Sequence, residues 1–217
     1  MWRIATPMHF KFPRTPHLPW SPGTTSDDRL LKNTDHFVGM EVVVTQKLDG
    51  ENTSIYKDRH HARSIDSLYH PSRALVRQLF EDIKNEIPES WRICGENVYA
   101  KHSIHYTNLD SYFYLFSVFN EQNECLSWDD MVEWGKLLGL LSVPEIYRGV
   151  WDENKIKACW TGECEFGLQE GYVVRNVNSF NYCDYAKNVA KYVRKGHVQT
   201  SQHWLRQPIT RNLLKNG

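Results

Sequence analysis

Four charged side chains lie inside or beside segments whose other residues predict buried β-strands. They are Lys47, Glu96, Glu170 and Lys191. Lysine and glutamate are rarely buried unless they are paired or functional. A lysine amine that loses its proton can act as a covalent nucleophile, and a buried carboxylate can bind or position a reacting group. The structural alternatives are an exposed turn lysine and carboxylates that pair with arginines.

The segment around Lys47 is predicted to be a β-hairpin. The β-branched run 42–45 favours an extended, half-buried chain. Asp49-Gly50 predicts a tight turn, because glycine adopts positive φ without steric cost. Alternation of apolar and polar residues resumes at 53–56. Lys47 would therefore stand at the edge of this hairpin.

Strands are predicted to dominate the rest of the chain, with helices inserted among them. Apolar residues at helical spacing predict a helix over 72–87 before Pro88, and a second helix over 127–141 begins at Ser127 as its N-cap. A third helix is expected over 152–160. Further strands are expected at 91–99, 112–119, 143–147, 166–175 and 188–195. This order predicts an α+β fold with mostly antiparallel sheets flanked by helices.

The two ends of the chain differ in composition from its centre. Five prolines in residues 1–40 predict an irregular arm that packs on the core, although Arg14 or His17 could instead lie over a site. From Lys187 to the C-terminus there are seven basic residues and no acidic ones. A C-terminal stretch that carries only positive charges suits a polyanionic partner. The alternative is a solvated tail whose charge is incidental. A short helix is expected at 203–206.

Composition excludes several classes of protein. The 217 residues carry 26 basic and 26 acidic side chains, and no apolar run approaches the roughly 20 residues of a membrane-spanning helix. The N-terminus lacks the apolar core of a signal peptide. The five cysteines have no C-x-x-C spacing, which indicates thiols in a reducing compartment and no structural zinc. We therefore expect a cytoplasmic monomer that does not bind membranes.

The order of several motifs resembles that of covalent nucleotidyltransferases, the class that contains polynucleotide ligases and mRNA capping enzymes. The motifs are Lys47-Leu48-Asp49-Gly50, Arg63, Gly95-Glu96-Asn97, Phe116, Glu170-Gly171 and Lys191. Each is short and occurs by chance, but their joint order is much more specific. The chain is most similar to ATP-dependent RNA ligases, in particular to the group of the second RNA ligase of phage T4. The segment 95–104 is similar to stretches of that family, and the resemblance covers about residues 40–200.

The resemblance implies a nucleotidyltransferase domain over 41–200, between the arm and a short basic segment at 201–217. No separate OB-fold domain is expected, because the chain ends soon after the last predicted strand. By the same resemblance, Lys47 is the catalytic nucleophile that becomes adenylylated. Lys191 is the second catalytic residue, which contacts the α-phosphate and stabilises the charge that develops there.

The remaining roles concern the nucleotide and its metal ion. Arg63 and Glu96 are expected to hold the ribose and neighbouring groups, and Phe116 to stack on adenine. Glu170 is the expected ligand of Mg²⁺ or Mn²⁺, because hard cations prefer oxygen ligands. The full set expected to bind ATP is Gln46, Asp49, Gly50, Arg63, Glu96, Phe116, Glu170, Lys191 and Arg194.

The chemistry requires an amine that can be neutral near pH 7. Burial and neighbouring cations lower the pKa of a lysine. The implied fold places Lys191 and Arg63 near Lys47, so we expect a lowered pKa for Lys47.

Two positions depart from the family pattern. Ser117 follows Phe116 where related ligases commonly have an aspartate, so a carboxylate is expected to be missing from the pocket. The last motif usually has two lysines one residue apart, but this chain has Val193 at the second position. Arg194, or less favourably Lys195, is the expected substitute.

The sequence as a whole predicts an ATP-dependent RNA ligase. It would join 5′-phosphate and 3′-hydroxyl RNA ends through a lysyl-AMP intermediate and an adenylylated 5′ end. The alternatives are an ATP-dependent DNA ligase, a capping-type enzyme that uses GTP, and a catalytically inactive relative that binds RNA.

Overall fold

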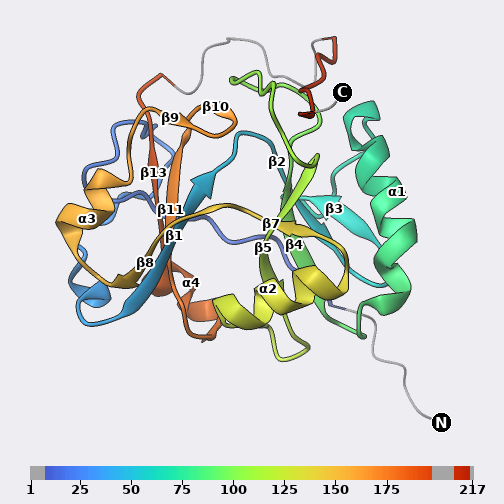
Figure 1. Ribbon diagram of the computed structural model, residues 1–217. Helices are drawn as coiled ribbons and strands as arrows, with labels where there is room; N and C mark the ends of the chain where they lie inside the picture. The colour runs from blue at the N-terminus through green and yellow to red at the C-terminus, as the bar shows by residue number, and fades with distance from the viewer. Residues whose placement is uncertain (1–7, 197–207, 216–217) are drawn as a thin grey trace.

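The chain folds around two β-sheets that share one central pocket, as the computed structural model shows (Figure 1). The structure describes residues 8–196 and 208–215. The first sheet is fully antiparallel, with the strand order β13-β11-β1-β8. Its strands are β1 (Glu41–Lys47), β8 (Glu145–Val150), β11 (Gly171–Asn176) and β13 (Val189–Val193).

The second sheet has seven strands in the order β12-β6-β5-β4-β2-β3, with β7 paired in parallel to β5. Its strands are β2 (Glu51–Ile55), β3 (His60–Ala62), β4 (Arg92–Asn97), β5 (Phe113–Phe119), β6 (Glu124–Cys125), β7 (Leu141–Ser142) and β12 (Phe180–Asn181). A small separate hairpin joins β9 (Glu163–Cys164) to β10 (Gly167–Leu168). The expected α+β class with mostly antiparallel sheets is confirmed.

Helices cover the outer parts of both sheets (Figure 1). They are α1 (Ala74–Ile83), α2 (Trp128–Leu137), α3 (Glu153–Ala158) and α4 (Tyr185–Asn188), with 3₁₀ turns at Asp35–Phe37, Pro71–Arg73, Lys84–Glu86 and Tyr182–Asp184. The first three agree with the expected helices, although each is shorter than expected. Ser127 caps α2 as predicted, because its hydroxyl accepts a hydrogen bond from the amide of Asp130.

The predicted hairpin at Lys47 is wrong. β1 and β2 do not pair with each other, because β1 pairs with β8 and β11 while β2 pairs with β3 and β4. The chain crosses from one sheet to the other at residues 48–50, as Figure 1 shows between β1 and β2. Gly50 does not have a positive φ. Glycine is needed there because a Cβ atom would overlap the backbone oxygen of Asn97.

Asp49 fixes this crossover through its carboxylate. One oxygen, Oδ2, accepts hydrogen bonds from the amide and the hydroxyl of Ser103, both at 2.7 Å, and from the amide of Ile104 at 2.8 Å. The amide of Asp49 donates to the hydroxyl of Tyr106 at 2.9 Å. The side chain thus ties the crossover to the loop that follows β4.

The described part of the proline-rich arm, residues 8–40, runs along the open edge of β13. The amide of Leu18 donates to the oxygen of Lys191 at 2.8 Å, and the amide of Lys191 donates to the oxygen of Pro16 at 2.9 Å. These bonds cover backbone groups that an edge strand would otherwise expose. Phe12 is buried against Phe116 and Tyr185. The arm therefore contacts both sheets.

The described C-terminal residues 208–215 dock on the segment after β4. Asn212 is fully buried, and its side chain donates to the oxygen of Val98 and accepts from the amide of Tyr106. The helix expected at 203–206 lies outside the described residues. Within the part of the chain that the structure describes, no helix combines the length and the apolar character needed to cross a bilayer.

Replacing Asp49 tests whether it is a structural residue of the crossover. We expect Asp49→Ala to lower the free energy of unfolding by about 3 kcal/mol, because three donors lose a charged acceptor. Asp49→Asn is the matched control and should cost less than half as much, because it keeps one oxygen acceptor. Urea denaturation measures both values. Equal stability of Asp49→Ala and the wild type would contradict this role.

Candidate active site

A pocket between the two sheets brings together six of the residues that the sequence singled out. Its walls come from β1, β4, β5, β11, β13 and the N-terminal arm, which contributes Phe12, Pro13 and Thr15. Among the lining residues are six expected site residues: Gln46, Lys47, Arg63, Glu96, Phe116 and Lys191. They come from segments far apart in the chain, so the sheet registers place them.

Lys47 and Glu170 form the central contact of this site. Lys47 ends β1 and pairs in register with Gly171, the first residue of β11. Glu170 therefore stands directly beside Lys47, and Lys47 Nζ donates to Glu170 Oε2 at 2.6 Å. Gly171 permits this arrangement, because a Cβ atom there would overlap the backbone oxygen of Tyr192 on β13. Glu170 is buried at 4% exposure, whereas Lys47 keeps 23% of its side chain exposed.

The expected lowering of the Lys47 pKa is wrong for the ligand-free protein. Burial alone would lower this pKa, but the negative charges of Glu170, Glu96 and Asp49 outweigh burial and raise it above the ordinary value of lysine. Neighbouring cations alone would lower this pKa, but the carboxylates around Lys47 have the larger effect. Lys47 is therefore protonated near pH 7 in the ligand-free protein.

Both glutamates have raised pKa values. Burial raises the pKa of Glu96 to about 8, against the opposing effect of the Lys47 charge. Burial likewise raises the pKa of Glu170 to about 7, although Lys47 favours its ionised form. Glu96 Oε1 also accepts a hydrogen bond from the amide of Gly50 at 3.2 Å. Perturbed pKa values of this kind cluster at functional sites.

Lys191 faces the same pocket from β13. Burial and the positive charge of Lys47 lower the pKa of Lys191 to about 8, although Asp28 and Glu170 oppose this shift. The carboxylate of Asp28 lies 3.9 Å from Lys191 Nζ and comes from the N-terminal arm. The sequence reasoning missed Asp28, because nothing in an irregular segment indicates which distant strand it will contact.

An apolar part of the pocket lies beside these charged groups. Phe116 on β5 and Val173 on β11 line it from the two sheets. Arg63 follows β3 and is half-buried, with its Nε atom buried and without a hydrogen-bond partner among the described residues. Gln46 also lines the pocket, and its side-chain oxygen accepts from Gln169 at 3.1 Å.

Four expected ATP-binding residues lie outside the lining of this pocket, and one of them, Glu170, reaches it only through its hydrogen bond with Lys47. Asp49 and Gly50 support the crossover, and Gly50 reaches the site only through its amide bond to Glu96. The amide of Arg194 donates to the backbone oxygen of Glu170 at 3.0 Å, but the Arg194 side chain does not line the pocket. Arg194 follows the last residue of β13, one position after Val193. The structure thus places it as a neighbour of Glu170.

The donor set suits a divalent ion that is shared with a phosphate ligand. Among the described residues there is no group of three or more acidic, histidine or cysteine side chains arranged to hold a metal. Mg²⁺ commonly takes one or two protein carboxylates and completes its shell with water and phosphate oxygens. Glu170 fits this pattern, because its buried carboxylate faces the pocket residue Lys47.

Comparison with protein families gives one match that covers most of the chain. The model of the family described as RNA ligase matches residues 40–193. These limits contain the pocket residues from β1 to β13, and they exclude the N-terminal arm. No curated protein matches the chain.

Several solved structures have a similar fold. A Naegleria gruberi RNA ligase with pyrophosphate is 19% identical, with a TM-score of 0.57, and the match covers 74% of this chain and 51% of that one. A variant of the same ligase with ATP and Mn is 15% identical, with a TM-score of 0.55 and coverages of 83% and 59%. An archaeal ATP-dependent RNA ligase is 17% identical, with a TM-score of 0.54 and coverages of 86% and 48%. The chain thus spans about half the length of these relatives, and the likeness confirms the fold.

The protonation of Lys47 gives a test of the site's electrostatics. We expect the Lys47 ammonium to titrate above the ordinary range of lysine, and Glu170→Gln to lower that pKa, because it removes the closest negative charge. NMR of the protein with ¹³C-methylated lysines measures each titration. The exposed Lys187, which pairs with Asp184, is the control, and its pKa should be the same in the two proteins. A Lys47 pKa that is unchanged in Glu170→Gln would contradict the ion-pair explanation.

Proposed function

This chain belongs to the RNA ligase family, and we propose that it is an ATP-dependent RNA ligase that works through a lysyl-AMP intermediate. The observation that carries the proposal is the contact of Lys47 with Glu170 at 2.6 Å in a pocket that Lys191 also lines. A nucleophilic amine, a carboxylate and a second cation then surround one reacting phosphate. These are the groups that phosphoryl transfer requires, because its catalysis depends on positioning and on charge stabilisation.

In the proposed first step, the Lys47 ammonium releases a proton to solvent, and the resulting neutral amine attacks the α-phosphorus of ATP and loses a second proton to solvent as the phosphoramidate forms. The bond to the bridging oxygen of the β-phosphate breaks, pyrophosphate leaves, and AMP remains attached to Lys47 through a phosphoramidate bond. Lys191 stabilises the negative charge on the α-phosphate during this exchange. A divalent ion held by Glu170 and by phosphate oxygens would neutralise further charge on the phosphates.

The apolar part of the pocket is proposed to hold the nucleoside. The aromatic ring of Phe116 offers a stacking surface for adenine, and Val173 lies across from it on the other sheet. Arg63 and Glu96 lie at the charged end of the pocket and would bind the ribose. The solved relatives with ATP and with pyrophosphate support this use of the fold.

The two later steps are proposed from the family. AMP passes from Lys47 to a 5′-phosphate RNA end, and a 3′-hydroxyl end then attacks that activated phosphate and releases AMP. Because the chain spans about half the length of its solved relatives, the way in which it engages RNA is a separate proposal. The basic residues from Lys187 onward are the proposed electrostatic contacts for the RNA backbone.

Transfer of a labelled nucleotide tests the first step. We expect wild-type protein incubated with α-labelled ATP and Mg²⁺ or Mn²⁺ to become covalently labelled, and Lys47→Ala to lose at least about a thousandfold of this signal, because the nucleophile is absent. Lys136→Ala removes an exposed lysine outside the pocket and should label like the wild type. Labelling by GTP or NAD in preference to ATP, or full labelling of Lys47→Ala, would refute the assignment.

A sealing assay tests the choice of substrate. We expect 5′-phosphate RNA ends to be joined to 3′-hydroxyl ends faster than matched DNA ends at the same ATP concentration. Nicked duplexes and single strands of equal sequence are compared by gel electrophoresis. Equal or faster sealing of DNA would favour a DNA ligase, and labelling without any sealing would show that the joining steps need a further component.

A further inference from the structure

A buried arginine lines the proposed nucleotide pocket and has no role in the chemistry described above. Arg175 is on β11, two residues after Val173, and both side chains line the pocket. Residues two apart on a strand point to the same face of the sheet. Arg175 therefore lies farther along the wall against which the base is proposed to rest. Only 4% of its surface is exposed.

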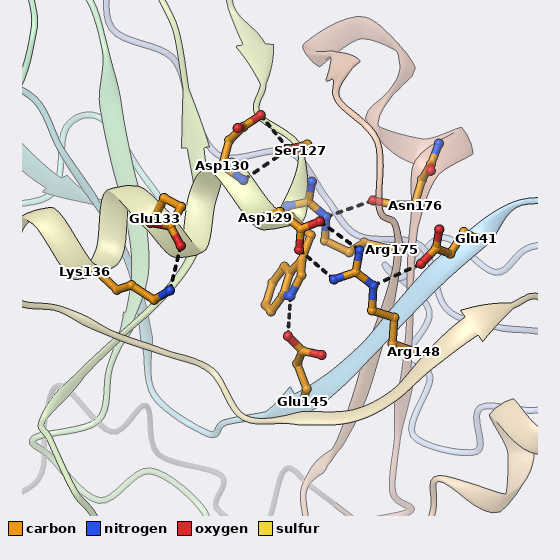
Figure 2. A network of polar contacts seen from close by, with 11 residues as sticks. Glu41, Ser127, Asp129, Asp130, Glu133, Lys136, Glu145, Arg148, Arg175 and Asn176 are labelled. Carbon is orange, nitrogen blue, oxygen red and sulfur yellow. Dashed lines mark hydrogen bonds and ion pairs between the residues drawn. The ribbon is translucent and has the colours of Figure 1, made fainter.

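The hydrogen bonds of this guanidinium are incomplete. Its Nε donates to the backbone oxygen of Asn176 at 3.1 Å, a contact shown in Figure 2, and its Nη2 donates to the oxygen of Leu126 at 2.7 Å. The remaining nitrogen, Nη1, is buried and has no hydrogen-bond acceptor among the described residues. A buried, charged donor without an acceptor is destabilising, so such groups are normally paired.

The neighbours of Arg175 do not supply the missing acceptor. None of the ion pairs found in the described residues includes Arg175. Its guanidinium carbon makes cation–π contacts, at 5.7 Å from the centroid of the Trp128 ring and 5.3 Å from that of Phe180. Arg175 lies close enough to the Cys125 thiol to favour the ionised form of that thiol, but burial outweighs this effect and raises the pKa of Cys125, so the thiol stays neutral and is only a weak acceptor for Arg175. Ser117 is buried and lines the same pocket, at the position where related ligases commonly have an aspartate. Its hydroxyl adds no negative charge to the lining of the pocket.

A purine base carries the hydrogen-bond acceptor that Arg175 Nη1 lacks. Its flat faces suit the walls formed by Phe116 and Val173, and its edge carries ring nitrogens that accept hydrogen bonds. We propose that Arg175 reads the base of the bound nucleotide by donating a hydrogen bond from Nη1 to a ring nitrogen of adenine, and that Ser117 makes this possible by leaving Nη1 unpaired. This inference rests on the proposed function, because it places the nucleotide base in this pocket.

Equilibrium binding of ATP analogues tests the proposal without requiring catalysis. The probes are ATP and its 1-deaza, 3-deaza and 7-deaza analogues, each of which lacks one ring-nitrogen acceptor, and calorimetry gives their dissociation constants. We expect wild-type protein to bind one analogue about 10- to 100-fold more weakly than ATP, which corresponds to one hydrogen bond from a charged donor. The other two analogues should bind like ATP.

Two variants separate base reading from a structural role. Ser117→Asp keeps Arg175 and supplies a carboxylate that accepts the Nη1 hydrogen bond. This variant should therefore bind ATP as weakly as the wild-type protein binds its weakest analogue. Arg175→Met removes the donor, so it should no longer distinguish ATP from that analogue. Arg148→Met is the matched control, because Arg148 lies at the surface and pairs with Asp129 and Glu41 outside the pocket (Figure 2). It should bind all four nucleotides like the wild type.

The possible outcomes separate the role of Arg175 from the ligase proposal. Equal wild-type affinity for all four nucleotides, or full discrimination in Ser117→Asp, would overturn the role of Arg175, whether or not Arg175→Met folds. Discrimination by a wild-type protein that forms no covalent adduct would support base reading and refute the ligase proposal. Absence of ATP binding by the wild type would overturn both.

Discussion

The burial of one ion pair between two strands is the constraint on which the site depends. Lys47 ends β1 and Glu170 precedes β11, and the antiparallel register of these strands brings the two side chains to 2.6 Å. An amine and a carboxylate at a buried position stabilise each other, and removing one leaves the other as an unpaired buried charge. The close packing of β13 against Gly171 then brings Lys191 toward the same point. One register thus fixes the carboxylate and both cations of the proposed reaction.

Local sequence patterns predicted those elements whose signals lie within a few residues of each other. The apolar spacing before Pro88 and the cap at Ser127 were sufficient to predict α1 and α2, because helix formation depends on near neighbours. The hairpin at Lys47 failed because Asp49-Gly50 has the same local signal whether the chain turns back or crosses to another sheet. That choice is made by distant partners: β8 and β11 for β1, and β3 and β4 for β2. The family pattern, in contrast, predicted which residues the fold would gather.

The gathering of these residues at one pocket was more predictable than their electrostatics. Gln46, Arg63, Glu96, Phe116 and the two lysines line one pocket, as the resemblance implied. The direction of the Lys47 pKa was wrong because it depends on the whole set of surrounding charges, in which Glu170 and Glu96 outweigh burial. Asp28 could not be foreseen, because it reaches Lys191 from an irregular arm. Ser117 was recognised as a departure, but only the structure shows that it faces the same pocket as Arg175.

The central claim is that Lys47 is the covalently modified residue of this site. The most direct measurement is peptide mapping by mass spectrometry after incubation of the wild-type protein with ATP and a divalent metal ion. The account predicts a single AMP group, attached through a phosphoramidate bond to Lys47. An AMP group on Lys191 or on any other residue, with Lys47 unmodified, would contradict it.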